Sequence, residues 1–278
     1  MKEYNDLCMD LSTVITQRYS TSFTRGIKTL HKRFHNPIYS VYGFVRLADE
    51  IVDTFHEFDK KKLLEKFRND TWDAIDSKIS TNPVLHAFQL IVNKYAIEKE
   101  LIEAFLYSME MDLEKKDYDE SFYNTYIYGS AEVVGLMCLR VFCEGDATLY
   151  DNLVEPAKRL GAAFQKVNFL RDLKSDYQER GRVYFPGVDF SNFNNTVKKQ
   201  IELDIDNDFR AAYPGMMQLP KGVRPGVYTA FIYYRELLKN IQKVPAGQVM
   251  ETRIRVPDMR KVILLMRTYT KFGMSAFF

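Results

Sequence analysis

The sequence predicts an all-α protein whose 278 residues form a single domain. Glycine and proline, which usually separate short strands, are sparse, at 13 and 9 residues. The long stretches between them repeat their apolar residues at helical spacing, and none alternates like a strand bounded by turn residues. Hydrophobic residues make up 46% of the chain, an ordinary globular composition that is sufficient for a sizeable core.

The individual helices follow from the positions of these breaks. Pro37 marks the start of a helix through the apolar segment IYSVYGFVRLADEIVDTFHEF. A long helix is expected after Pro156, through LGAAFQKVNFLRDLKSDY. The remaining helices are predicted over residues 59–80, 83–95, 98–113, 121–143, 196–213 and 226–242, with a last one from about Pro257.

Charge and cysteine content exclude some classes of protein. The chain has 39 basic and 37 acidic residues, both interspersed, so the concentrated basic surface of a nucleic-acid-binding protein is not expected. The three cysteines form no CxxC motif, which indicates a reducing compartment without a disulfide framework. Aromatic residues reach 14%, which fits either a large apolar cavity or an aromatic core.

The sequence also predicts a cytoplasmic protein that is at most peripheral to a membrane. Its N-terminus, MKEYNDLCMD, is too charged for a signal peptide, and Arg140 interrupts the most apolar run, VVGLMCLRVFC. Basic residues near the end of the chain could contact anionic lipid or phosphate, although scattered surface charge is the simpler interpretation; they are Arg253, Arg255, Arg260, Lys261 and Arg267.

The first informative motif is RLADEIVD, in which Asp49 and Asp53 are four residues apart. On a helix this spacing places both carboxylates on one face, with Arg46 on the same side. Such a pair is usually a solvated helix face. Here apolar residues surround it on nearly every side, so the helix should be largely buried and the carboxylates need partners.

The second motif, QKVNFLRDLKSD, repeats this spacing at Asp172 and Asp176. Asn168 lies one turn before Asp172, and Gln165 about two turns before it, so oxygen-bearing side chains form a stripe on an otherwise apolar helix. Two such helices suggest facing acidic walls around a cation. With no His or Cys ligands at suitable spacing, hard oxygen ligands favour Mg²⁺ or Mn²⁺, and a diphosphate is the natural anion.

With these motifs, the sequence resembles the squalene/phytoene synthase family of head-to-head prenyl transferases over nearly its whole length. YSTSF at 19–23 looks like the family's S-x-S-F element, and RLADEIVD looks like its first aspartate-rich motif. YIYGSAEVVGLM at 126–137 is similar to its Y-x-Y-x-x-A-G-x-V-G-L-M stretch, and QKVNFLRDLKSDYQERGRVYFP at 165–186 to its second motif. The DEIVD form is most like that of bacterial phytoene synthases.

The resemblance implies an isoprenoid-synthase helical bundle around a central cavity, and a role for each motif residue. The implied metal ligands are Asp49, Asp53, Asn168, Asp172 and Asp176. Arg46 and Arg171 would neutralise phosphate charge, and together with the four aspartates they make up the implied catalytic set. The implied substrate-binding residues are Ser20, Ser22, Phe23, Tyr42, Tyr128, Gln165, Asn168 and Tyr234.

The implied reaction is the condensation of two geranylgeranyl diphosphates, through a cyclopropyl diphosphate, to phytoene, the first step of carotenoid synthesis. It would use Mg²⁺ or Mn²⁺ and no NADPH. Two alternatives stay open: a C30 enzyme that makes dehydrosqualene or squalene from farnesyl diphosphate, and a non-catalytic scaffold. Substrate length, oligomeric state and any membrane-docking surface do not follow from the sequence.

Some residues depart from the family pattern or imitate another motif. Glu132 stands where the family commonly has Gly, and Tyr19 and Thr21 stand where basic or imidazole side chains are frequent. The run from Asp204 to Asp208 imitates the start of an EF-hand loop, but it lacks the required Gly and Glu. We expect this run to be a solvated acidic helix face.

Overall fold

The computed structural model describes residues 1–113, 119–176, 184–188 and 192–273. Within these ranges the regular elements are all helical, in agreement with the predicted fold class. Each begins and ends as follows: α1 Lys2–Tyr19, α2 Thr21–Lys28, η1 Lys32–Phe34, α3 His35–Asp53, α4 Lys60–Ser77, α5 Pro83–Tyr95, α6 Lys99–Met111, α7 Glu120–Ile127, η2 Tyr128–Glu132, α8 Val133–Cys143, α9 Ala147–Lys174, α10 Asn195–Met216, α11 Arg224–Gln242, α12 Ala246–Glu251 and α13 Asp258–Phe272.

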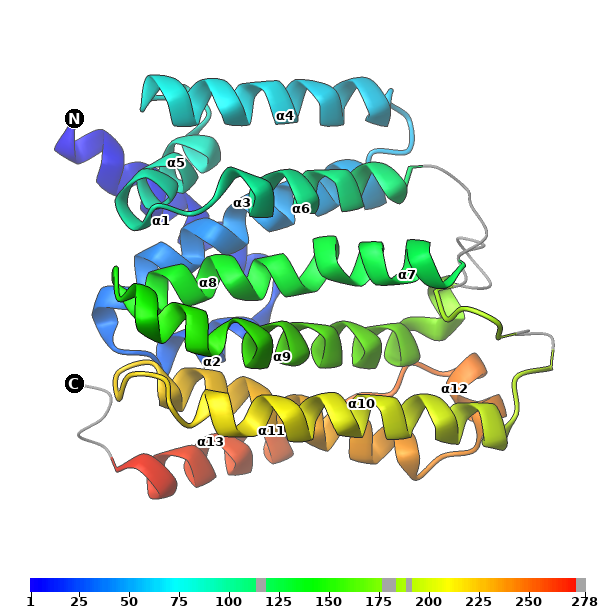
Figure 1. The fold of residues 1–278 in the computed structure, drawn as a ribbon. Coiled ribbons are helices and arrows are strands. Elements are labelled where there is room, and N and C mark those ends of the chain that lie inside the picture. Colours follow the sequence, from blue (N-terminus) through cyan, green and yellow to red (C-terminus); the bar gives the residue numbers. More distant parts are fainter. Residues whose placement is uncertain (114–118, 177–183, 189–191, 274–278) are drawn as a thin grey trace.

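The helices form successive layers that run roughly parallel or antiparallel to one another (Figure 1). Helix α4 forms one edge of the molecule, and α13 lies at the opposite edge against α11. Helix α3 packs against α1, α4, α5, α6 and α8, whereas α9 packs against α8, α10, α11, α12 and η2. The two helices that carry the aspartate motifs therefore belong to different parts of the bundle.

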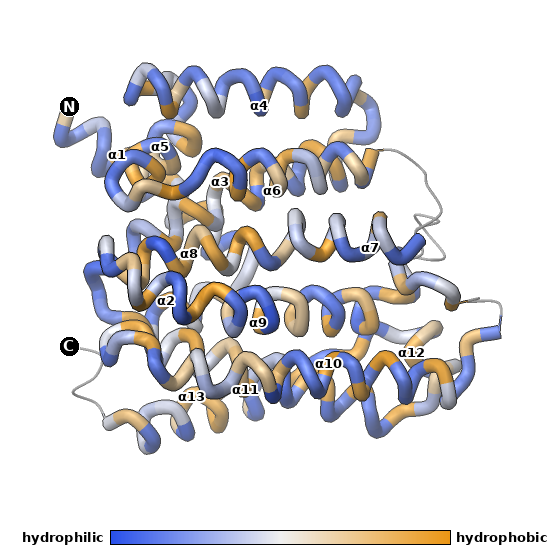
Figure 2. The backbone as a smooth tube through the Cα atoms, viewed as in Figure 1, coloured by the Kyte–Doolittle hydropathy of each residue, from blue (hydrophilic) through white to orange (hydrophobic). Residues whose placement is uncertain are grey.

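An aromatic cluster holds α3 in place. The Phe44 ring stacks on Phe88 of α5 with centroids 3.9 Å apart, and the rings of Phe67 of α4 and Phe105 of α6 each lie 5.4 Å from it. Phe44, Phe88 and Phe105 are completely buried. Figure 2 shows the contrast with the edge, where α4 is hydrophilic along most of its visible side. Truncation of Phe44 to Ala should cost about 3–5 kcal/mol of folding free energy.

Pro156 does not start a helix, contrary to the prediction. Helix α9 begins at Ala147, nine residues earlier, and Asp146 caps it by accepting a hydrogen bond from the backbone N–H of Leu149. Pro156 lies inside the helix. A Cβ on Gly215 of α10 would lie 2.3 Å from the Pro156 ring. The missing side chain at Gly215 makes room for the proline ring, so α10 packs closely against α9 where α9 continues through Pro156.

The expectation of a solvated face from Asp204 to Asp208 is wrong for Asp206 and Asp208, whereas the Asp204 side chain is 59% exposed. Asp208 is only 3% exposed and accepts hydrogen bonds from Lys166 at 2.7 Å and Arg159 at 3.2 Å. Asp206 pairs with Arg235 of α11. The acidic spacing on α10 therefore fastens this helix to α9 and α11, because buried carboxylates require cationic partners.

One helical stretch, Glu120–Cys143, is long and apolar enough to span a membrane by composition alone, and no other in the described residues is. It comprises α7, η2 and α8, and 56% of its most apolar window is buried inside the protein. Because it packs against α6 and α9 on either side, we interpret it as a core helix of the bundle.

Candidate active site

The N-terminal part of the predicted site forms where α1 ends and α2 begins. Ser20 caps α2 and accepts a hydrogen bond from the backbone N–H of Phe23 at 3.2 Å. The Phe23 ring stacks on Tyr42 of α3 with centroids 4.6 Å apart. Tyr19 lies beneath the Arg46 guanidinium, 4.3 Å from it. Tyr19, a departure from the family pattern, thus contacts a predicted catalytic arginine through a cation–π interaction.

Asp49 is the most strongly perturbed carboxyl of the site. Its pKa is raised from 3.8 to about 7, chiefly by burial; Arg46 opposes this shift, and nearby Asp53 and Asp112 add to it. Arg46 is shared, since its guanidinium contacts Glu50 closely and lies 3.9 Å from the Asp49 carboxylate. Asp49 keeps 34% of its side-chain exposure, so the group is enclosed by protein atoms and still accessible to a small ion.

On α9, Asp172 is held by two arginines. Arg171 Nε lies 3.1 Å from both carboxylate oxygens, and Arg253 Nε lies 2.8 Å from Oδ1. One turn earlier, the Oδ1 atom of Asn168 is buried without a hydrogen-bond partner. One turn later, Asp176 is 7% exposed. Helix α9 therefore presents the Asp172 carboxylate, neutralised by two arginines, one turn from the Asn168 side-chain oxygen that has no hydrogen-bond partner.

Tyr234 of α11 connects the two aspartate helices. Its ring stacks on Phe164 of α9 with centroids 4.1 Å apart. Burial raises the pKa of Tyr234, while Arg171 and then Asn168 act to lower it, which places its hydroxyl beside the second motif. Burial also raises the pKa of Tyr42, with smaller contributions from Asp49 and from Tyr234. Tyr42 of α3 and Tyr234 of α11 therefore act on one another electrostatically.

The other predicted substrate-binding residues lie on the same helices with fewer contacts. Ser22 is half-buried in the first turn of α2, and Gln165 is half-buried one turn before Asn168. Tyr128 begins the π-helical turn η2, where its ring lies 5.6 Å from the ammonium group of Lys158. Residues 177–183 of the second motif, including most of its R-G-R-V-Y-F-P trailer, lie outside the described residues.

Glu132, the other departure from the family pattern, lies where the backbone of η2 closely approaches Gly161 of α9. A Cβ on Gly161 of α9 would lie 2.8 Å from the carbonyl oxygen of Ala131 and 3.0 Å from Cα of Glu132. Only glycine permits this approach of α9 to η2. The Glu132 carboxylate then lies 3.9 Å from Lys158, and its pKa is raised by burial despite this partner.

Two residues of the site were not predicted from the sequence. Arg253, in the segment between α12 and α13, was grouped with scattered surface charge, yet it contacts Asp172. Asp112 directly follows α6, accepts a hydrogen bond from the Tyr126 hydroxyl at 2.7 Å and acts on the pKa of Asp49. Neither residue has a helical-spacing partner within its own motif, so only the tertiary fold brings it to the aspartates.

The donor set fits a hard divalent cation. Every predicted ligand offers oxygen, and the buried, unpartnered Oδ1 of Asn168 is an acceptor that a cation would satisfy. Among the described residues, no three His, Cys, Asp or Glu side chains gather closely enough to hold an ion by themselves. These residues therefore fit ions bound by one or two protein oxygens, with phosphate and water in the other positions, as Mg²⁺ prefers.

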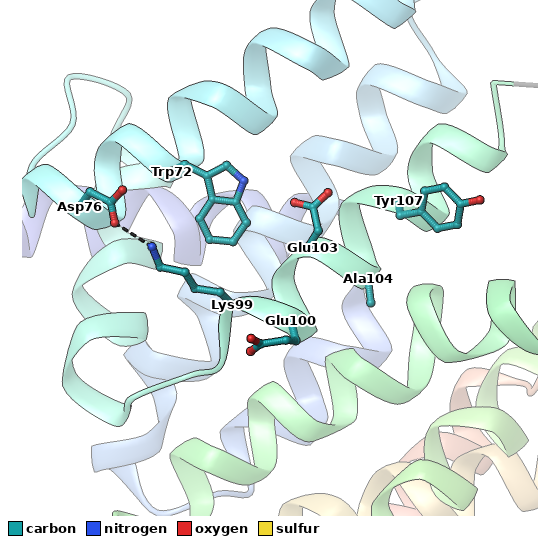
Figure 3. Close-up of a pocket in the computed structure, with 7 residues that line it drawn as sticks. All are labelled: Trp72, Asp76, Lys99, Glu100, Glu103, Ala104 and Tyr107. Atoms are coloured by element: carbon teal, nitrogen blue, oxygen red, sulfur yellow. Dashed lines mark hydrogen bonds and ion pairs between the residues drawn. The ribbon is translucent and has the colours of Figure 1, made fainter.

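One hollow on the surface lies away from the aspartate motifs. It measures about 670 Å³, lies between α4 and α6, and is lined by Trp72, Lys99 and Tyr107 among others (Figure 3). Lys99 pairs with Asp76 at 3.0 Å and lies 5.5 Å from the Trp72 ring. This hollow contains none of the residues that the motifs single out, and its one lysine is already paired with Asp76.

Comparison with known proteins explains this constellation. The family model described as squalene/phytoene synthase matches residues 16–212, which include both aspartate motifs. The chain belongs to the squalene/phytoene synthase family. It is therefore a prenyltransferase of the head-to-head condensing class, and proteins of this family generally use a divalent metal.

Individual relatives are distant but extensive. A phytoene synthase from Arthrospira platensis is 27% identical over 287 residues, covering 92% of this chain and 90% of the relative. A 4,4'-diapophytoene synthase from Staphylococcus haemolyticus (strain JCSC1435) is 26% identical over 197 residues, covering 68% and 66%. The crystal structure of a dehydrosqualene synthase in complex with a ligand superposes with a TM-score of 0.84 at 24% identity, covering 97% and 98% of the two chains. This superposition establishes the isoprenoid-synthase fold.

Proposed function

We propose that this enzyme condenses two geranylgeranyl diphosphates to phytoene, the first step of carotenoid synthesis. The observation that carries the proposal is the convergence of charged and polar groups from α3, α9 and α11 around the Tyr42 and Tyr234 hydroxyls. Two of the five buried side-chain atoms without a hydrogen-bond partner in the described residues belong to this site. They are a donor, Arg46 Nε, and an acceptor, Asn168 Oδ1, as a site for an anion and its cation requires.

The chemistry assigns a task to each group. The first diphosphate leaves its allylic carbon, the double bond of the second substrate attacks the resulting cation, and loss of a proton closes a cyclopropane. Departure of the second diphosphate, rearrangement and loss of another proton then give phytoene. Arg46 and Arg171 bind diphosphate oxygens, and Ser20 and Ser22 donate hydroxyl hydrogen bonds to them. The stacked rings of Phe23 and Tyr42 face the cationic carbons and help to exclude water.

The divalent cation would be held by Asp49 and Asp53 on one side and by Asn168, Asp172 and Asp176 on the other. When bound, Mg²⁺ or Mn²⁺ supplies positive charge that stabilises the leaving diphosphate. The expected raised pKa of Asp49 in the metal-free protein is consistent with a carboxylate that lacks its cation. No reductant is needed, because each half-reaction ends with loss of a proton.

The competing proposal is a C30 enzyme that converts farnesyl diphosphate to dehydrosqualene. It is favoured by the similarity to the diapophytoene synthase and by the superposition on a dehydrosqualene synthase. The two proposals differ only in the length of hydrocarbon that the enzyme accepts. We further propose a cytoplasmic location, with membrane contact for delivery of a water-insoluble product.

The test is incubation of the purified protein with each prenyl diphosphate and Mg²⁺, with and without NADPH, followed by analysis of extracted hydrocarbons. Phytoene from the C20 substrate without NADPH supports the proposal. Dehydrosqualene from the C15 substrate alone supports the competing proposal, and NADPH-dependent squalene contradicts both. Absence of hydrocarbon from a folded protein would favour a scaffold role.

A further inference from the structure

The last helix of the described chain, α13, is fastened to the bundle by one face only. Leu264 is 4% exposed and Thr268 is completely buried against α11. The Thr229 hydroxyl of α11 donates a hydrogen bond to the Thr268 hydroxyl at 3.1 Å. Phe272 packs edge-to-face on Tyr228 of α11, with ring centroids 5.2 Å apart. Figure 1 shows α13 at the edge of the molecule, with its other side turned outward.

That outward side carries a stripe of exposed apolar residues. Met259 is 74% exposed, Val262 40%, Ile263 45% and Met266 61%. Their spacing of three, four and seven residues places them on one face, opposite Leu264 and Thr268. A contiguous apolar stripe of this kind on a soluble fold indicates an interaction surface.

Basic side chains border this apolar stripe. Helix α13 contains four basic residues and one acidic residue. Arg260, Arg267 and Lys271 follow one another along the same edge of the helix, between the apolar stripe and α11. Arg267 and Lys271 also line a hollow of about 270 Å³ against α11, together with Lys239 and aromatic rings. Within the described residues Arg267 and Lys239 form no ion pair, so both are available to an anion.

Helix α1 provides a natural contrast. It also exposes an apolar stripe, with Leu7 at 53%, Leu11 at 37% and Val14 at 49%. However, α1 contains three acidic residues and two basic residues, and Asp10 adjoins the stripe. An anionic surface would attract α13 and repel α1, so the charge pattern identifies the occupant as negatively charged as well as apolar.

We propose that α13 lies on the surface of an anionic lipid bilayer. Its apolar stripe enters the boundary between head groups and acyl chains, and Arg267 and Lys271 contact lipid phosphates, as in other interfacial amphipathic helices, while Arg260 stays paired with Glu236 of α11. This surface is separate from the aspartate motifs, so the proposal does not depend on which hydrocarbon the enzyme makes. It would place the enzyme where a water-insoluble product can leave.

The test is co-sedimentation of the full chain with phosphatidylcholine vesicles, with or without about one third phosphatidylglycerol. We expect binding to the anionic vesicles and at least tenfold weaker binding to the neutral ones. Met259→Ser/Met266→Ser should weaken binding to anionic vesicles at least tenfold, and Arg267→Gln on the order of fivefold. The matched control, Leu7→Ser/Leu11→Ser on α1, should bind as the wild type does.

All substituted positions are exposed, and circular dichroism and thermal unfolding check that each variant folds. Absence of binding to anionic vesicles, or equal loss in the α1 and α13 variants, would overturn the proposal. Sedimentation equilibrium tests the other occupant, a second copy of the chain. A dimer that dissociates on Met259→Ser/Met266→Ser would assign the stripe to self-association and would also overturn it.

Discussion

The two helices that carry the aspartates share one spacing and differ in how their charges are compensated. On α3, Arg46 contacts Glu50 closely and reaches Asp49 only at 3.9 Å, so burial keeps the pKa of Asp49 at about 7. On α9, Asp172 is surrounded by Arg171 and Arg253, with contacts of 3.1 and 2.8 Å. The sequence pattern is therefore the same, while the tertiary neighbours leave one carboxylate short of positive charge and saturate the other.

The largest expected effect is on catalysis, where both helices should prove equally necessary. Asp49→Asn and Asp172→Asn should each lower kcat/KM at least a hundredfold, because each removes a charge that stabilises the bound cation and diphosphate. Steady-state assays with the active prenyl diphosphate measure this. The control is Asp70→Asn on α4, whose ion pair with Lys66 is exposed. Full activity of either aspartate variant would refute its role as a ligand.

The next largest effect is on the rise in Tm caused by ligand, which should depend on Asp49 of α3. Mg²⁺ with inorganic pyrophosphate should raise the Tm of the wild type, since a ligand at a hundred times its Kd stabilises by about 2.7 kcal/mol. The rise in Tm should disappear in Asp49→Asn, which removes a carboxylate that we expect to bind the cation. Differential scanning calorimetry at fixed ionic strength measures it. A shift of the same size in Asp49→Asn would show that α9 alone supplies the binding.

Without metal, Asp49→Asn and Asp172→Asn should change the free energy of unfolding in opposite directions. The folded-state pKa of Asp49 is raised from 3.8 to about 7, so the folded protein binds more protons than the unfolded chain between these values. Stability is then lost as pH rises through this window, and Asp49→Asn should recover on the order of 1 kcal/mol at pH 8, after allowance for solvent screening.

Asp172→Asn should do the opposite, because it leaves Arg171 and Arg253 without their carboxylate. Urea unfolding in EDTA at acidic and alkaline pH gives both differences. The gain for Asp49→Asn should vanish below about pH 3, where the carboxyl is protonated in both states. A gain that persists below about pH 3, or a shared sign for the two variants, would contradict the assigned electrostatics.

The smallest effect concerns Arg253. Its side chain is 53% exposed, so Arg253→Gln should destabilise the metal-free protein by less than about 1 kcal/mol. The same change should raise KM more than it lowers kcat if the guanidinium also attracts diphosphate. Arg255→Gln, also in the exposed segment after α12, is the matched control. Equal kinetics in the two variants would make the Asp172 contact of Arg253 incidental to substrate binding.

The sequence was sufficient for the features that depend on local periodicity. The all-helical fold class and the helices from residue 35 to residue 143 follow from apolar spacing, and the start predicted at Pro37 lies two residues inside α3. The family assignment follows from the motifs and agrees with the matched range. Local spacing also predicts each aspartate pair on one helix face; Asp49 and Asp53 both lie on α3, whereas Asp176 lies two residues after the end of α9.

Features that depend on contacts between distant segments were missed. Helices α1 and α2 were not predicted, and Pro156 was taken for a helix start because nothing local indicates that Gly215 makes room for it. The acidic run on α10 resembled a solvated face because its partners, such as Lys166 and Arg235, come from other helices. For the same reason Arg253 and Asp112 escaped notice, and the roles of the predicted site residues remain predictions.

The aromatic cluster around Phe44 also determines which backbone amides should be protected from hydrogen exchange. Phe44 lies little more than one turn from Asp49 and joins α3 to α4, α5 and α6. Backbone amides from Gly43 to Ala48 should therefore exchange with deuterated solvent only when the whole bundle opens, whereas those of α13, attached to α11 by one face, should exchange through local fraying. The helix that carries Asp49 is therefore rigid, and we expect the helices that face it to make the adjustment to substrates of different length.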